Sequence, residues 1–165
     1  GKGVKQNSQK ALNYFQQATR LKLPAAQYYL GIKYYAGLGI NKDLNKAREL
    51  LIQAAEQDHL EAQFQLGLFY EKGEGGQQDS ELATYWITKA AENGFGPAQH
   101  TLAARYLTGN GVQLNLKKGV FWMEKAAEQY DFDAMRDLGF LYIQGMGVEK
   151  DYKRARELLL SLIHF

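Results

Sequence analysis

The sequence predicts an all-α fold, a solenoid of about four and a half helix–turn–helix repeats of 36 residues with about nine helices. The first observation behind this prediction is the period itself, which is carried by Ala26, Ala62, Ala98 and Ala134 and by Tyr34, Tyr70, Tyr106 and Tyr142. The second is that apolar residues within each period recur at helical spacing, and the third is a glycine-containing turn between the two helical stretches. One such unit has too little core to be stable alone, so neighbouring repeats must stack.

The first helix is expected over residues 7–21. Its apolar face consists of Ala11, Tyr14, Phe15 and Ala18. This helix corresponds to the second helix of a repeat, so residues 1–23 are predicted to be a partial repeat. The opening Gly-Lys-Gly-Val matches the loop at 109–112, and we therefore expect the chain to be a piece of a longer array.

The next repeat carries signals for the start and end of each helix. Pro24 suits the first turn of a helix, where its missing N–H group is not needed. Gly37 suits the end of that helix, because glycine adopts the left-handed conformation that closes a helix. Asp43 is placed to cap a second helix that runs to about Asp58.

The same unit recurs at 60–94, 97–130 and 133–164, with predicted caps at Asp79, Asn115 and Asp151. The chain is therefore expected to be a single solenoid domain over 1–165. Its predicted divisions are the partial repeat 1–23 and the repeats 24–60, 61–96, 97–132 and 133–165.

Composition narrows the classes of partner. Lys and Arg number 20 against 18 Asp and Glu, and the two signs are interspersed, so the positive field that attracts nucleic acid is missing. No apolar run approaches 18 residues, which argues against direct membrane insertion. The chain has no cysteine, which is compatible with an oxidising or a reducing compartment, so localisation stays open.

The repeat motif resembles the Sel1-like repeat, a relative of the tetratricopeptide repeat with a longer, glycine-rich turn. The motif reads Ala-x-x-x-Leu-Gly-x-x-Tyr, then a glycine turn, then Lys-Ala-x-x-Trp-x-x-Lys-Ala-Ala, and is most complete at 62–94. The chain departs from it at Gly76, Ala103, Gly119 and 162–163. The resemblance implies a right-handed α/α superhelix that serves as an adaptor or scaffold, in bacteria often in envelope, signalling or host-interaction processes.

No residue pattern predicts catalysis, a metal site or a cofactor. The glycine turns follow helices and lack the third glycine of a dinucleotide-binding loop. The histidines at 59, 100 and 164 fall in different repeats, so metal binding would need them to converge. None of the three serines is followed by lysine three residues later, as a Ser-x-x-Lys nucleophile requires. We therefore predict that the protein is not an enzyme.

The sharpest candidate site is the face of the first helix of each repeat, which is expected to line a concave groove. The residues predicted to bind a partner there are Tyr28, Ile32, Tyr35, Phe64, Leu68, Glu71, His100, Leu107, Arg136, Phe140 and Ile143. This set is mostly apolar or aromatic, as interaction surfaces are, and its charged members would supply specificity. At any one of these positions, packing between adjacent first helices is the competing explanation.

The leading functional hypothesis is a protein-interaction module that holds a peptide or partner protein in this groove. The alternative is a structural spacer, or a segment that self-associates through exposed ends of the array. A third hypothesis, an enzyme acting on cell-wall material, has no residue constellation behind it.

Overall fold

The computed structural model describes residues 13–14 and 17–162, which consist of α-helices joined by turns. Eight helices have both ends within this part of the chain: α2 (Pro24–Ala36), α3 (Leu44–Ala55), α4 (Leu60–Lys72), α5 (Ser80–Glu92), α6 (Gly96–Thr108), α7 (Leu116–Ala127), α8 (Phe132–Gln144) and α9 (Tyr152–Ser161). Residues 13–14 and 17–20 are also helical, while most of the helix expected at 7–21 lies outside the described residues. The all-α prediction is confirmed.

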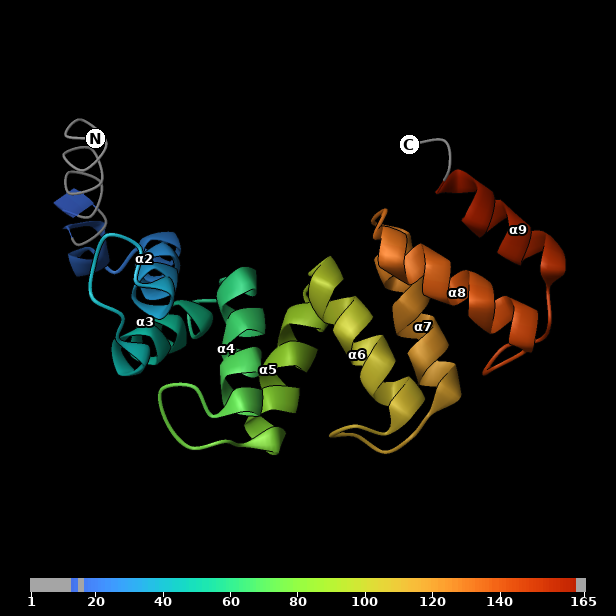
Figure 1. The fold of residues 1–165 in the computed structure, drawn as a ribbon, viewed down its shortest axis with the longest axis horizontal. Coiled ribbons are helices and arrows are strands. Elements are labelled where there is room, and N and C mark those ends of the chain that lie inside the picture. The colour runs from blue at the N-terminus through green and yellow to red at the C-terminus, as the bar shows by residue number, and fades with distance from the viewer. Residues whose placement is uncertain (1–12, 15–16, 163–165) are drawn as a thin grey trace. The chain divides into compact units, whose positions relative to one another are not determined.

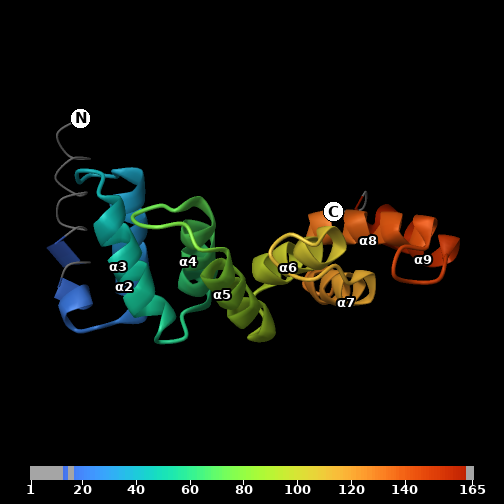
Figure 2. The same cartoon turned by 90° about the horizontal axis from the view of Figure 1, so that it is seen from below.

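The chain divides into two compact units, Gly1–Trp86 and Ile87–Phe165, with the boundary inside α5. Within the first unit α2 packs along α3, and α3 packs against α4 (Figures 1 and 2). Within the second unit the same pattern runs from α6 to α9, each helix packing on the next in sequence. Each unit therefore contains helical hairpins stacked through their second helices.

Small side chains let these helices approach closely, and large ones fill the space between them. In the first unit Ala47, Ala54 and Ala55 are fully buried beside Leu51 and Phe69. In the second unit the core consists of Ala103, Val120, Met123, Ala126, Ala134, Leu138 and Leu141. Trp86 and Trp122 pack in or against these two cores, as their periodic position predicts.

The predicted caps hold the second helix of each repeat. The side chains of Asp43, Asn115 and Asp151 each accept a hydrogen bond from the backbone N–H three residues later. Asp79 accepts from the N–H groups of Glu81 and Leu82. Each cap satisfies helix N–H groups that have no partner within the helix.

The second glycine of two turns, Gly75 and Gly147, also packs against the preceding repeat. Gly75 and Gly147 have φ of 66° and 73°, which favours glycine. A Cβ atom on Gly75 would collide with the backbone of Leu44, and one on Gly147 would lie 2.7 Å from the carbonyl carbon of Leu116. The sequence predicts a tight reversal at these glycines, and the structure adds that the turn touches the start of the preceding second helix.

Two departures from the motif compensate for each other. A Cβ atom on Gly31 of α2 would lie 3.2 Å from the carbonyl oxygen of Ala47 on α3. In α6 and α7 the glycine lies on the second helix instead of the first. Ala103 of α6 occupies the position of Gly31, and Gly119 of α7 occupies the position of Ala47. A Cβ atom on Gly119 would lie 3.2 Å from the carbonyl oxygen of Ala103. The helix pair needs one glycine at this crossing, and either helix can supply it.

Buried glutamines at 27, 63 and 99 form a periodic feature that the sequence reading missed. The side-chain amide of Gln99 donates to the carbonyl oxygen of Ala91 at 3.1 Å, and Gln63 makes the equivalent bond to Ala55 at 3.1 Å. Gln129 in turn donates to the side-chain oxygen of Gln99 at 2.7 Å. These amides satisfy carbonyl groups at the end of the second helix, where helix bonding stops.

Candidate partner-binding surface

In the first unit, the predicted residues of α2 are half-buried and pack against the core of that unit. Tyr28, Ile32 and Tyr35 all contact the core cluster. The Tyr28 ring stacks on the His59 ring with centroids 5.0 Å apart, and the Tyr35 ring contacts Phe69 at 5.1 Å. These contacts join the face of α2 to α4, so each of these side chains serves packing as well as the surface.

Polar groups surround the two tyrosines. The Tyr35 hydroxyl lies 3.5 Å from a carboxylate oxygen of Glu74, and the Lys42 ammonium lies 5.7 Å from the Tyr35 ring. Burial raises the pKa of the Tyr28 hydroxyl above its ordinary value, and the Glu61 carboxylate raises it further. The face of α2 thus combines aromatic area with a few charged groups at its edge.

The predicted residues of α4, Phe64, Leu68 and Glu71, are also half-buried. The most accessible aromatic side chain on the first helices of this unit is Tyr29, which is 53% exposed and was absent from the predicted set. Its ring contacts that of Tyr28 edge to face, with centroids 5.3 Å apart. Helical spacing places Tyr29 beside the predicted stripe, but spacing alone does not show which side of the stripe a neighbouring helix covers.

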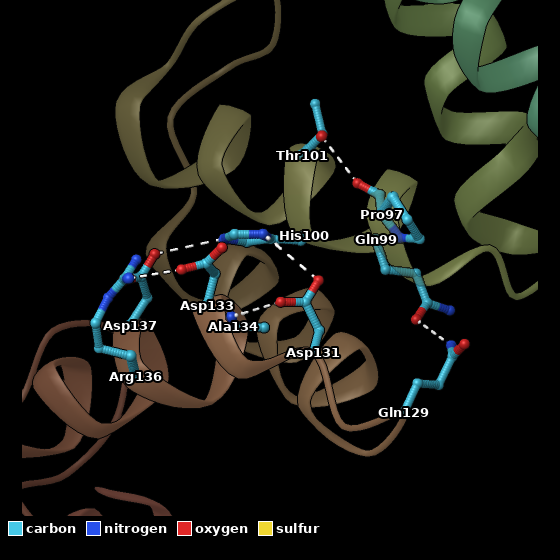
Figure 3. Close-up of polar contacts among 10 residues, drawn as sticks. All are labelled: Pro97, Gln99, His100, Thr101, Gln129, Asp131, Asp133, Ala134, Arg136 and Asp137. Atoms are coloured by element: carbon cyan, nitrogen blue, oxygen red, sulfur yellow. Dashed lines mark hydrogen bonds and ion pairs between the residues drawn. The ribbon is translucent and has the colours of Figure 1, made fainter. Parts of the chain in front are cut away.

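In the second unit, His100 of α6 lies between two carboxylates of the α8 segment (Figure 3). Its Nδ1 atom is 3.7 Å from Asp131 Oδ2, and its Nε2 atom is 3.4 Å from Asp137 Oδ2. Asp131 also caps α8, because its Oδ1 atom accepts from the Ala134 N–H at 3.0 Å. The residue that starts α8 therefore also orients the imidazole of His100.

Arg136 extends this polar cluster along α8. Its guanidinium pairs with Asp133 at 2.6 Å and with Asp137 at 2.9 Å. The hydrogen bond that Arg136 donates to the Asp137 carboxylate is the main reason why the pKa of Arg136 is raised above its ordinary value. Three carboxylates thus face one guanidinium and one imidazole, so this cluster has an excess of acidic groups.

The remaining predicted residues of the second unit fall into different surroundings. Phe140, one turn after Arg136, is 48% exposed. Leu107 is half-buried against the core, next to Gly119. Ile143 is half-buried and lines a hollow between α8 and α9. The structure brings His100 and Arg136 together through Asp137, whereas Leu107 packs on the core and Ile143 lines the hollow, both outside this cluster.

Sequence reasoning missed His59, Asp131 and Asp137 as parts of this surface. His59 and Asp131 occupy the same repeat position, and each caps a first helix with its side chain. Each also contacts the residue at the start of the predicted stripe on the preceding first helix, Tyr28 of α2 or His100 of α6. A polar residue just before a first helix was the available signal, and comparing caps across repeats would have found it.

No group of three or more His, Cys, Asp or Glu side chains in the described part of the chain is arranged to hold a metal ion. Among the helices that the structure describes, none has the length and apolar character needed to cross a bilayer.

Comparison with known proteins identifies the repeat. The model of the Sel1 repeat family matches five consecutive segments, at residues 1–23, 24–59, 60–95, 96–131 and 132–162. No curated protein sequence matches the chain.

Several solved structures are similar. A protective antigen of uropathogenic Escherichia coli with an SLR fold is 37% identical over 93% of this chain, with a TM-score of 0.88. A Sel1 repeat protein from Oxalobacter formigenes is 31% identical over 95%, with a TM-score of 0.91. Cysteine rich protein B of Helicobacter pylori is 27% identical over 79%, with a TM-score of 0.62.

The chain covers 33% of the first of these proteins, 46% of the second and 94% of the third. It thus spans less than half the length of the first two of these proteins. These relatives are bacterial, and Sel1 repeats generally mediate protein interactions on a non-catalytic scaffold. The repeats, their helical hairpins and these likenesses show that the chain is an α-solenoid and belongs to the Sel1 repeat family.

Proposed function

We propose that this chain is a non-enzymatic interaction module that binds a peptide or partner protein on its first helices, α2 and α4 in one unit and α6 and α8 in the other. The single observation that carries the proposal is the exposure of large aromatic side chains on these helices, Tyr29 and Phe140. Aromatic residues contribute a large share of binding energy where a partner buries them.

The two units offer different chemistry to a partner. On α2 and α4, Tyr28, Ile32, Phe64 and Leu68 provide a mainly apolar face. On α8, Phe140 lies within one turn of Asp137 and Arg136, in the acidic cluster around His100. A segment bound to the second unit is therefore expected to place an apolar side chain against Phe140 and a basic side chain near the aspartates.

Paired lysine substitutions test this surface. Phe140→Lys is expected to weaken partner binding about tenfold or more, because it removes an aromatic anchor and adds a positive charge. Tyr29→Lys is expected to do the same for a partner that contacts the first unit. The measurement is affinity capture from native lysate with the chain as bait, followed by a binding isotherm with the captured protein.

The chain offers matched controls on its second helices. Phe121 on α7 is 49% exposed and Tyr85 on α5 is 55% exposed, close to Phe140 and Tyr29. Phe121→Lys and Tyr85→Lys should therefore leave binding unchanged if the first helices hold the partner. If the second-helix variants lost as much affinity as the first-helix variants, binding would not be specific to the first helices. Unchanged binding in all four variants would refute the proposal.

A further inference from the structure

One arginine in the first unit connects a repeat to the repeat that follows it. The guanidinium of Arg48 on α3 lies over the Tyr70 ring, 4.2 Å from its centroid. It also donates a hydrogen bond to the carbonyl oxygen of Gln77 at 3.2 Å. Arg48 thus contacts both the end of the following first helix and the turn after it.

This contact depends on the turn residue Gly76. A Cβ atom on Gly76 would collide with the Arg48 guanidinium, so a larger residue would push the guanidinium away from Tyr70 and Gln77. In the second unit the equivalent residues are Val120 and Val148, which pack in the same apolar cluster. Arginine on the second helix, at Arg48, is therefore paired with glycine in the following turn. Valine on the second helix, at Val120, is paired with valine in the following turn.

The same position on α9 is again an arginine, Arg156, which is exposed. Beside it is a hollow of about 300 Å³ whose other lining residues are Ile143, Tyr152, Ala155, Leu159 and Leu160. Val120 and Met123, the counterparts of Arg156 and Leu159 one repeat earlier, are 3% and 1% exposed in the cluster that α7 forms with α8. The hollow is therefore the counterpart of a surface that a first helix covers.

We infer that this face of α8 and α9 binds one further Sel1-type hairpin, with an aromatic residue at the end of its first helix and glycine at the turn position of Gly76. The apolar hollow would receive the first helix, and Arg156 would pack on the aromatic ring and the glycine turn, as Arg48 does. Arg156 selects such a hairpin against one with valine in the turn. This inference is independent of the proposed binding surface on the first helices.

A second copy of this chain is a poor occupant. The turn position is Ile40, Val112 and Val148 in the other repeats, and only the 60–95 repeat has glycine there. That glycine already lies against Arg48 of the same chain. The hairpin that fits Arg156 must therefore come from a repeat other than those described.

The test extends the full chain with a second copy of residues 58–95, placed directly after Phe165 so that the 36-residue spacing continues. Hydrogen exchange of the α9 amides reports whether this face is covered. Exchange in α9 is expected to slow about tenfold in the extended chain, because packing suppresses local opening. Exchange at the rate of the unextended chain would overturn the inference.

Selectivity is tested in a four-way comparison. Substituting valine for the glycine that corresponds to Gly76, in the appended copy alone, should remove most of the protection of α9. With Arg156→Val in the host chain, the copy that carries valine should protect α9 at least as well as the copy that carries glycine. Equal protection by both copies in both backgrounds would overturn the assignment of selectivity to Arg156.

Sedimentation of the unextended chain tests whether a second copy of the chain covers this face instead. A monomer whose α9 becomes protected only on extension supports the inference. A dimer that protects α9 without the extension would overturn it, because a second copy would then be the occupant.

Discussion

A partly buried hydrogen bond ties two repeats of the second unit together. The Tyr142 hydroxyl on α8 donates a hydrogen bond to a carboxylate oxygen of Glu124 on α7 at 2.8 Å. Burial raises the pKa of Tyr142, and the Glu124 carboxylate raises it further because it accepts the phenolic proton and repels a phenolate. The neutral phenol is thus the form that the folded state favours.

This pKa shift predicts the effect of alkaline pH. Because the folded-state pKa is raised above the unfolded value of about 10, the contribution is fully present below that pH and is lost as pH rises through the folded-state pKa. The free energy of unfolding should therefore fall more steeply above about pH 10 in the native chain than in Tyr142→Phe. Urea unfolding at several pH values measures this, with Tyr152→Phe as an exposed control. Parallel curves for the native chain and Tyr142→Phe would contradict the prediction.

At the scale of the helix, a single methyl group limits how closely two helices can approach where they cross. A Cβ atom added to Gly119 of α7 would lie 2.6 Å from Leu107 Cδ2 and 3.2 Å from the Ala103 carbonyl oxygen. Alanine is the better helix former by about 1 kcal/mol, whereas overpacking costs about 1–3 kcal/mol. The steric cost is the larger of the two effects.

Gly119→Ala is therefore expected to lower the free energy of unfolding by about 1 kcal/mol, measured by urea denaturation. Leu107→Ala removes the closest atoms and leaves only the Ala103 carbonyl oxygen at 3.2 Å, so Gly119→Ala made in that background should cost less than in the native chain. A loss of the same size in both backgrounds would show that Leu107 is not the obstacle.

At the scale of the whole molecule, the 36-residue period was enough to predict the helical hairpins and the caps of their second helices. The compensation between Ala103 and Gly119 could not be predicted, because it depends on which helix backbone lies against which. The exposure of the candidate surface was also hard to predict, because it depends on which neighbouring helix lies against each residue. Periodicity placed Tyr28 and Tyr35 on the first-helix face, but two rings from the α4 segment, those of the cap His59 and of Phe69, decide how much of them is exposed.

Contacts between successive repeats can be measured through Arg48 and Gly76. Gly76→Val should lower the free energy of unfolding by about 1 kcal/mol, because it displaces the guanidinium from the Tyr70 ring. In an Arg48→Thr background the same change should cost much less, since Thr84 and Val112 occupy these two positions elsewhere in the chain. A double-mutant cycle by urea unfolding gives the coupling between the two residues. Additive effects would mean that Arg48 does not restrict the turn.

The pairing of Arg48 with Gly76 also bears on how such a gene can change. Tandem repeats gain and lose units by recombination between similar segments, which places a repeat beside a new neighbour. A copy with arginine at the position of Arg48 would then meet a turn with valine or isoleucine at the position of Gly76, unless the following repeat moved with it. The repeats that carry Arg48 and Gly76 are therefore expected to be inherited as a linked pair.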